Sequence, residues 1–229
     1  MLRPTEGTPE HLHYLLTHFI LRKGHAPKLE QLARLAGQSV ERTAKSQHQL
    51  EEMHGVILEP GTSRVWSLHP FALIPTAFWV SSKGRGWWAN CAWCALGIGA
   101  ALKKEVRIVT RDGAEGDPLE FTVDKGRASL PHLLMHFPFP PAMWWENPYC
   151  PCGNILFFSS EKKIEEWCER HGRPKGAVLS MEKALALAEA WFGDYASPKW
   201  RRKTPRDAAK IFEELDLDSE FWKFPDEFR

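Results

Sequence analysis

The sequence predicts an α+β protein, in which a winged-helix-like module of three helices precedes a mainly antiparallel sheet with flanking helices. Three observations support this prediction. Apolar residues recur at helical spacing in the first quarter of the chain, and two short alternating segments follow them. Further along, alternating segments between turn residues outnumber the helical ones. Serines, which are good helix N-caps, precede two amphipathic segments after the last predicted strand.

Residues 1–75 are expected to form the winged-helix-like module. Pro9 begins its first helix, residues 28–36 form a second that Gly37 ends, and Ser39 caps a third over residues 40–53. Residues 56–59 and 64–68 are expected to form a hairpin. Three helices followed by a hairpin is the order of a winged helix-turn-helix.

This order raises a DNA-binding hypothesis. The third helix carries side chains that can reach base edges, namely Arg42, Lys45, Gln47, His48 and Gln49. Three glutamates share that helix, so its charge is mixed. Winged helices also serve as structural modules, and a fold alone does not determine function. We therefore favour a structural role and expect no nucleic-acid partner.

Residues 76–196 are expected to form a second domain, which contains the cysteines. Alternation predicts strands at 76–80, 105–110, 119–123, 129–137 and 155–158. The low-polarity run 87–102 predicts a buried helix, where Gly97 and Gly99 allow close packing. Ser159 or Ser160 is expected to cap a helix over 161–170, and Ser180 another over 181–192.

Residues 197–229 are expected to form a C-terminal helical extension, with a short amphipathic helix over 205–215. A basic cluster comes before that helix, consisting of Lys199, Arg201, Arg202 and Lys203 beside Trp200. Two interpretations are open for the cluster. It either contacts phosphate or RNA, or it is the solvated flank of a helix, which we favour.

The bulk properties exclude several classes of function. The net charge is +1, which gives no general attraction for nucleic acid or an anionic membrane. The longest apolar run is too short to span a bilayer, and the N-terminus lacks the hydrophobic segment of a signal peptide. We expect a cytoplasmic protein without a membrane partner, where paired cysteines favour metal or redox chemistry over disulfides.

Four of the five cysteines lie in two short segments, Cys91-x-x-Cys94 and Cys150-Pro-Cys152. On a helix or tight turn the first spacing places both sulfurs on one side, and in an extended strand the second spacing does the same. Thiolates are ligands for soft metals, and a helix N-terminus at Cys91 or Cys94 would lower its pKa. A thioredoxin-like pair lacks its strand-helix-strand frame here, and Cys168 fits a packed structural residue.

Five tryptophans adjoin these segments, namely Trp87, Trp88, Trp93, Trp144 and Trp145. Trp has a large apolar surface that is costly to expose. Two interpretations are open, a Trp-rich core and a dry aromatic pocket around the sulfurs.

The run from Cys91 to Leu96 and the run from Cys152 to Phe158 resemble the two site segments of the organomercurial (alkylmercury) lyases. That family pairs an N-terminal winged-helix-like domain with a catalytic α+β domain. Its site combines a Cys-x-x-Asp segment, which opens a buried helix, with a second cysteine just before a strand that contains Phe-Phe. The resemblance covers about residues 10–192.

Two registers are open for the first segment. If Cys94 matches the first cysteine of the family, then Gly97 occupies the position of the acid. If Cys91 matches it, then Cys94 occupies that position. We prefer the second register, because it keeps the following Ala-Leu and the small apolar helix residues in step.

The resemblance implies that Cys91 and Cys152 act as thiolates that bind mercury and labilise the carbon–mercury bond. Cys94 then replaces the carboxylic acid that protonates the departing carbon. A thiol is the weaker acid, and it is a better ligand for a soft metal, so retention of mercury should be stronger. The expected partners are a small organometal or metal ion and low-molecular-weight thiols that remove the product; no cofactor is required.

A metal protein that is not a lyase is the alternative. The four residues Cys91, Cys94, Cys150 and Cys152 are compatible with a zinc or copper site. Such a site would serve either a soft-metal-binding protein or a metal-responsive winged-helix regulator.

Overall fold

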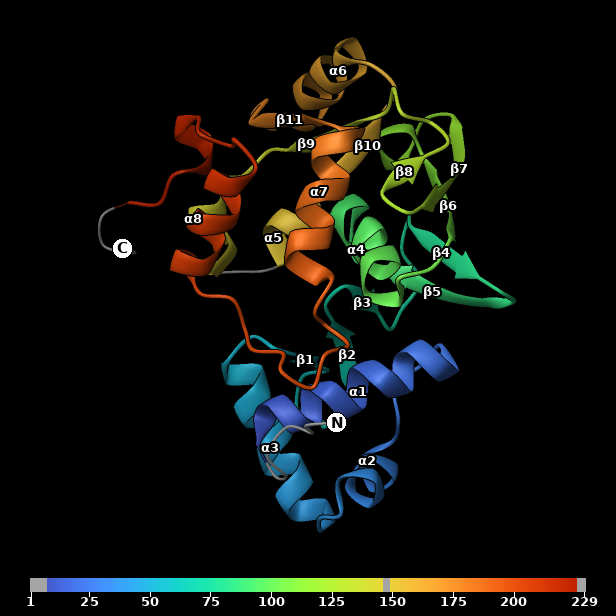
Figure 1. Cartoon of the computed structure of the whole chain (residues 1–229), viewed down its shortest axis with the longest axis vertical. Coiled ribbons are helices and arrows are strands. Elements are labelled where there is room, and N and C mark those ends of the chain that lie inside the picture. The colour runs from blue at the N-terminus through green and yellow to red at the C-terminus, as the bar shows by residue number, and fades with distance from the viewer. Residues whose placement is uncertain (1–7, 146–148, 226–229) are drawn as a thin grey trace.

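The computed structural model describes residues 8–145 and 149–225, although the side chains of Tyr149 and Cys150 lie outside the described part. The chain begins with three helices and a hairpin, in the predicted order (Figure 1). These elements are α1 (Pro9–Lys23), α2 (Leu29–Ala36), α3 (Val40–Glu52), β1 (Ile57–Leu58) and β2 (Val65–Leu68). The side chain of Ser39 accepts a hydrogen bond from Arg42 N at 3.2 Å, which confirms the predicted cap of α3.

The third helix presents only part of its predicted polar surface to solvent. Gln47, which was expected among the base-reading side chains, is 1% exposed. It faces the core of the N-terminal helices because α3 packs against both α1 and α2. The absence of a nucleic-acid partner stays a prediction.

Two antiparallel sheets follow, with helices on their faces, and this confirms the α+β class. The larger sheet has the order β1-β2-β3-β5-β4-β6-β7-β8, and the smaller has the order β10-β9-β11. Their remaining strands are β3 (Phe71–Ala72), β4 (Trp79–Ser82), β5 (Arg85–Ala89), β6 (Val106–Arg111), β7 (Pro118–Asp124), β8 (Arg127–Ala128), β9 (Leu134–Phe137), β10 (Leu156–Phe158) and β11 (Ala177–Ser180). Strands from both sides of residue 75 join in the larger sheet, while the division into three domains stays a prediction.

The remaining helices are α4 (Ala92–Leu102), α5 (Tyr149–Cys152), α6 (Glu161–His171), α7 (Met181–Phe192) and α8 (Pro205–Glu214). Short 3-10 turns lie at Asp112–Ala114, Pro141–Trp145 and Glu220–Trp222. The side chains of Ser160 and Ser180 accept hydrogen bonds from Lys163 N and Lys183 N, so they are the predicted caps of α6 and α7.

Three local predictions were wrong. Trp87 and the two residues after it belong to β5 rather than to the buried helix, because this strand pairs on both edges, with β3 and with β4. The segment 129–137 is a strand only at Leu134–Phe137, since Pro131 lacks the N–H that a ladder needs. The strands Phe71–Ala72 and Ala177–Ser180 were not predicted.

Helix α4 is the most deeply buried helix of the sheet region. It packs against β4, β5 and β7 on one side and against α7 on another. The close approach to α7 depends on Gly97, where an added Cβ would lie 2.4 Å from Cδ2 of Phe192. The prediction that this glycine allows close packing is therefore confirmed, and α7 holds α4 in place from its outer side.

The chain after α7 runs down to the N-terminal helices before it returns to form α8 (Figure 1). Nε2 of His18 lies 2.9 Å from the carbonyl oxygen of Ala196. The ring of His13 stacks on Trp200, with centroids 3.3 Å apart and an interplanar angle of 6°. Thr204 and Asp207 then form a capping box at the start of α8, where the amphipathic helix was predicted.

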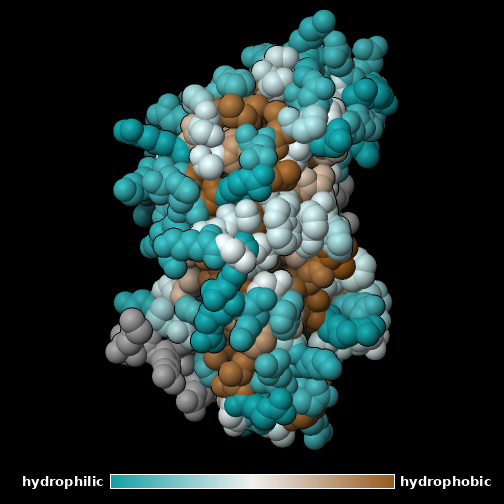
Figure 2. Space-filling view, turned by 90° about the vertical axis from the view of Figure 1, so that its right-hand side faces the viewer, coloured by the Kyte–Doolittle hydropathy of each residue, from teal (hydrophilic) through white to brown (hydrophobic). Residues whose placement is uncertain are grey.

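One side of the molecule is largely covered by hydrophilic side chains, with hydrophobic residues showing in patches between them (Figure 2). Within the described residues, no helix combines the length and apolar character needed to cross a membrane.

The contact at Gly97 predicts a cost for a single methyl group. Gly97→Ala should lower the free energy of unfolding by about 1–3 kcal/mol, because overpacking against Phe192 outweighs a gain of about 1 kcal/mol in helix propensity. Gly99→Ala is the matched control. It should cost less stability, because its added Cβ would lie 3.0 Å from Val106 Cγ2 rather than 2.4 Å from the nearest atom. Urea denaturation measures both variants, and a Gly97→Ala protein as stable as the wild type would contradict the prediction.

Candidate functional site

The first cysteine of the pair, Cys91, is the N-cap of α4. Its backbone is extended, with φ −160°, and its Sγ accepts a hydrogen bond from Cys94 N at 3.3 Å. A sulfur in this position lies at the positive end of the helix dipole and near an N–H that has no partner within the helix. Of the two cysteines considered for a helix N-terminus, Cys91 therefore occupies it, where negative charge on sulfur is stabilised.

The second cysteine segment is joined to the first by the backbone. Ala92 N donates a hydrogen bond to the carbonyl oxygen of Ile155 at 3.0 Å, directly before the buried strand β10. Cys152 ends α5 three residues earlier, and its Sγ lies 4.0 Å from Sγ of Cys91. The two segments are therefore brought together as predicted, although 61 residues separate the two cysteines in sequence.

His69 is a site residue that the sequence analysis did not identify. It lies in the turn after β2, and its Nε2 is 3.3 Å from Sγ of Cys152, 83 residues away in the chain. The ligand atoms of His69, Cys94 and Cys152 all lie within 4.8 Å of one another. No local motif marks this histidine, and only the path of the sheet brings it to the sulfurs.

The three thiols differ in their proton affinity. Burial raises the pKa of Cys91, but hydrogen bonds from the Cys152 and Cys94 thiols and from Cys94 N, together with nearby His69, hold it well below its usual value. Burial and the hydrogen bonds to Cys152 and Cys91 hold the pKa of Cys94 well above its usual value. The hydrogen bond to Cys91 likewise raises the pKa of Cys152. Of the three thiols, Cys91 is therefore the one that loses its proton most readily.

The imidazole of His69 is neutral in this setting. Burial lowers the pKa of His69, and the charge on Cys91 offsets this only in part. A neutral ring has one nitrogen with a free lone pair, so it can take a proton from a thiol in contact with it. The arrangement thus offers a nucleophilic sulfur, two proton donors and one proton acceptor.

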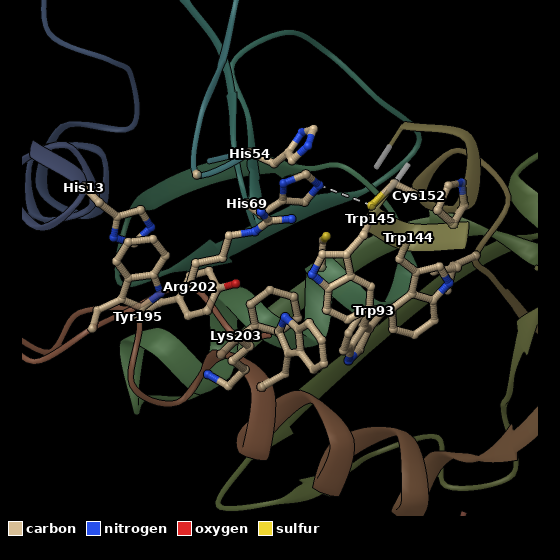
Figure 3. Close-up of a pocket in the computed structure, with 17 residues that line it drawn as sticks. His13, His54, His69, Trp93, Trp144, Trp145, Cys152, Tyr195, Arg202 and Lys203 are labelled. Carbon is tan, nitrogen blue, oxygen red and sulfur yellow. Dashed lines mark hydrogen bonds between the residues drawn. The ribbon is translucent and has the colours of Figure 1, made fainter. Parts of the chain in front are cut away.

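A pocket of about 110 Å³ opens beside the sulfurs and is shown in Figure 3. Cys94 and Cys152 lie in its wall, which is mainly aromatic. Its ring residues are His13, His54, His69, Trp93, Trp144, Trp145, Trp191, Phe192, Tyr195 and Trp200. The ring of Trp93 contacts those of Trp144 and Trp191, with centroids 5.1 Å apart in each case. Three of the five predicted tryptophans therefore line the pocket, together with two that come from later in the chain.

The other predicted residues lie apart from the pocket. Nε1 of Trp87 donates to the carbonyl oxygen of Ile20 at 2.9 Å, which fixes the sheet to α1. Trp88 packs on Trp79. Cys168 lies elsewhere, with its Sγ 3.7 Å from Nε2 of His136. The expected ligand Cys150 belongs to α5, but its side chain is outside the described residues.

His13 has a different position from the one the sequence indicated. It belongs to α1, whose polar residues could face solvent, yet it is 1% exposed and lines the pocket. Burial and the charge of Lys203 lower its pKa to about 3. The C-terminal segment covers it through Trp200, and the sequence carried no signal for that contact.

Comparisons with known proteins agree on one family. A family model described as alkylmercury lyase matches residues 71–193. The alkylmercury lyases of Bacillus cereus and Clostridium butyricum are each 28% identical to this chain over 175 residues, which are 73% of this chain and 75% of theirs. The crystal structure of the mercury-bound form of MerB2 has a TM-score of 0.66 and 24% identity, over 83% of this chain and 93% of that one. At this identity the structural likeness shows the fold.

The single thiolate predicts a distinct ultraviolet titration. In a Cys150→Ser background, thiolate absorbance should persist well below about pH 8.5, the ordinary pKa of a cysteine, because the pKa of Cys91 is lowered. Cys91→Ser should remove this absorbance at neutral pH. Cys168→Ser is the matched control and should retain it, since burial raises the pKa of Cys168. Thiolate absorbance that titrates at the same pH in the Cys91→Ser protein as in the wild type would refute the assignment.

Proposed function

The chain belongs to the alkylmercury lyase family, and from this premise we propose that it binds organomercurials through Cys91 and Cys152 and cleaves the carbon–mercury bond by protonolysis. One observation carries the proposal. The sulfur of Cys91, at a helix N-terminus, lies 4.0 Å from the sulfur of Cys152, which lines a pocket rich in aromatic rings. A soft metal prefers such sulfur ligands, and the rings suit an apolar organic group.

The reaction begins at Cys91. Its thiolate attacks the mercury of an R–Hg–X compound and displaces X. Cys152 then passes its proton to Nε2 of His69, 3.3 Å away, and binds the same mercury as a second thiolate. Electron density from two sulfurs weakens the carbon–mercury bond. Imidazole takes this role because it is neutral before the transfer.

The carbon then takes its proton from Cys94. The pKa of Cys94 is raised, so the thiol is still protonated when the substrate binds. The electron pair of the carbon–mercury bond forms a new C–H bond with that proton, and R–H leaves. The thiolate of Cys94 that remains becomes a third sulfur ligand to mercury. In this account Cys94 stands where the family has a carboxylic acid, as the preferred register implies.

A third sulfur ligand changes the last step of the cycle. Thiolate binds a soft metal more strongly than carboxylate does, so the mercury product should be retained longer. Its removal then requires exchange with low-molecular-weight thiols, which enter through the same pocket. Release of the metal, rather than bond cleavage, is therefore expected to limit turnover.

Two measurements with phenylmercury test this proposal. Benzene should form in excess thiol, and Cys91→Ser and Cys152→Ser should abolish it, while Cys168→Ser should have no effect. Cys94→Asp should raise turnover by roughly tenfold or more and should retain less mercury after dialysis, because carboxylate holds a soft metal less strongly than thiolate does. A folded wild-type protein that produces no benzene would refute the lyase activity, and an unchanged Cys94→Asp protein would refute the register.

A second candidate function rests on the same donors. His69, Cys94 and Cys152 place one nitrogen and two sulfurs within 4.8 Å of one another, and Cys91 adds a sulfur close by, a Cys₃His set that zinc also accepts. A resident zinc or copper ion would then hold this part of the fold together. Metal analysis of the purified protein tests the idea. About one equivalent of zinc or copper that is lost in a His69→Gln variant would favour this function over the lyase.

A further inference from the structure

One cation in the pocket has no role in the proposed chemistry. Arg202 lies between α7 and α8 and lines the pocket as a half-buried side chain. In Figure 3 it extends from the C-terminal segment toward His54 and His69. Its neighbours in sequence are neutralised, since Arg201 pairs with Asp207 at 2.7 Å and Lys203 with Asp194 at 3.0 Å. Within the described residues, Arg202 forms no ion pair.

The lining of the pocket contains no counter-charge for this guanidinium. Its polar and titratable residues are two cations, three histidines, two cysteines and Tyr195, and no Asp or Glu of the described part is among them. The positive charge of Arg202 also acts on its surroundings: burial lowers the pKa of His54, and Arg202 lowers it further. The end of the pocket around Arg202 is therefore positive, while the rest of the wall is aromatic.

A partly desolvated guanidinium costs free energy unless an anion pairs with it. The planar guanidinium matches the two oxygens of a carboxylate, with which it forms parallel hydrogen bonds. Nothing in the described wall supplies those oxygens, so a ligand is the natural source. Since Arg202 and the sulfurs line one pocket, one small ligand can reach both.

The position of Arg202 is fixed by the fold. The preceding Trp200 is 5% exposed and stacks on His13, and the following Lys203 lies 5.5 Å from the ring centroid of Tyr195. Arg202 also lies beyond residues 71–193, the part that the family model matches. The cation thus enters the pocket from the C-terminal segment, whereas Cys94 and Cys152 in the same wall lie within the matched residues.

We propose that the pocket selects mercury compounds that carry a carboxylate, which Arg202 binds while the sulfurs bind the mercury. The inference rests on the proposed function, because it takes the sulfurs as the mercury site. The carboxylate has two possible sources. It belongs either to the organic group that leaves as R–H or to the thiol that delivers the mercury.

The experiment compares matched ligands by titration of tryptophan fluorescence. The first pair is phenylmercury and 4-carboxyphenylmercury, which differ by a carboxylate on the organic group. The second pair is phenylmercury presented with 3-mercaptopropionate and with 2-mercaptoethanol, which differ by a carboxylate on the thiol. The proteins are the wild type, Arg202→Gln, Arg202→Lys, and Lys199→Gln as a control that removes one exposed charge from the same segment.

The wild type should bind the carboxylate member of at least one pair more tightly by roughly tenfold or more. Arg202→Gln should abolish that preference without weakening the binding of the ligand that lacks the carboxylate. Arg202→Lys should restore part of the preference, and Lys199→Gln should leave it unchanged. The pair that shows the preference identifies the source of the carboxylate. If the wild type binds the two members of each pair equally tightly, the inference is overturned and the proposed function is unaffected. If no mercury compound binds, the proposed function falls, and the inference falls with it.

Discussion

The site depends on one backbone hydrogen bond, from Ala92 N to the carbonyl oxygen of Ile155. It ties the first turn of α4 to the residue before β10, so the two cysteine segments share a fixed register. The side chain of Cys91 then caps the same helix. The hydrogen-bond acceptor that the N-terminus of α4 requires is thus a sulfur, and the helix dipole lowers the pKa of that sulfur. Phe192 of α7 packs directly against Gly97 of α4. The start of α4 therefore cannot shift away from Cys152 without a loss of this packing.

Three neighbouring sulfurs with little access to water cannot all be negatively charged. This constraint determines which of them acts as the nucleophile and which act as proton donors. Cys91 loses its proton most readily, because it has a backbone donor and two thiol donors, and its charge raises the pKa of Cys94 and Cys152. The same mutual dependence makes the cluster responsive to a metal. Once mercury takes the charge of Cys91, that charge no longer raises the pKa of the other two thiols, so mainly burial still opposes the release of their protons.

The sequence predicted those parts of the site that depend on residues close to one another in the chain. The buried helix after Cys91 and the apolar strand after Cys152 follow from neighbouring residues, and the resemblance paired the two segments. His69 and Arg202 were beyond such reasoning, because they approach the sulfurs from a sheet turn and from a C-terminal segment whose path depends on tertiary contacts. The basic cluster before α8 was expected to be solvated, yet the stack of Trp200 on His13 turns Arg202 into the pocket wall. The start of α4 was misjudged because strand pairing overrode the apolar character of Trp87 and Trp88.

The most direct test of the account is a crystal structure of the protein after reaction with phenylmercury. The account predicts a mercury ion without an organic group, bound by the sulfurs of Cys91, Cys152 and Cys94, with His69 still beside Cys152. Mercury held at Cys168, or in a set of ligands that leaves out Cys91, would contradict the assignment of the nucleophile. Phenylmercury bound intact at the three sulfurs in the presence of excess thiol would contradict the protonolysis.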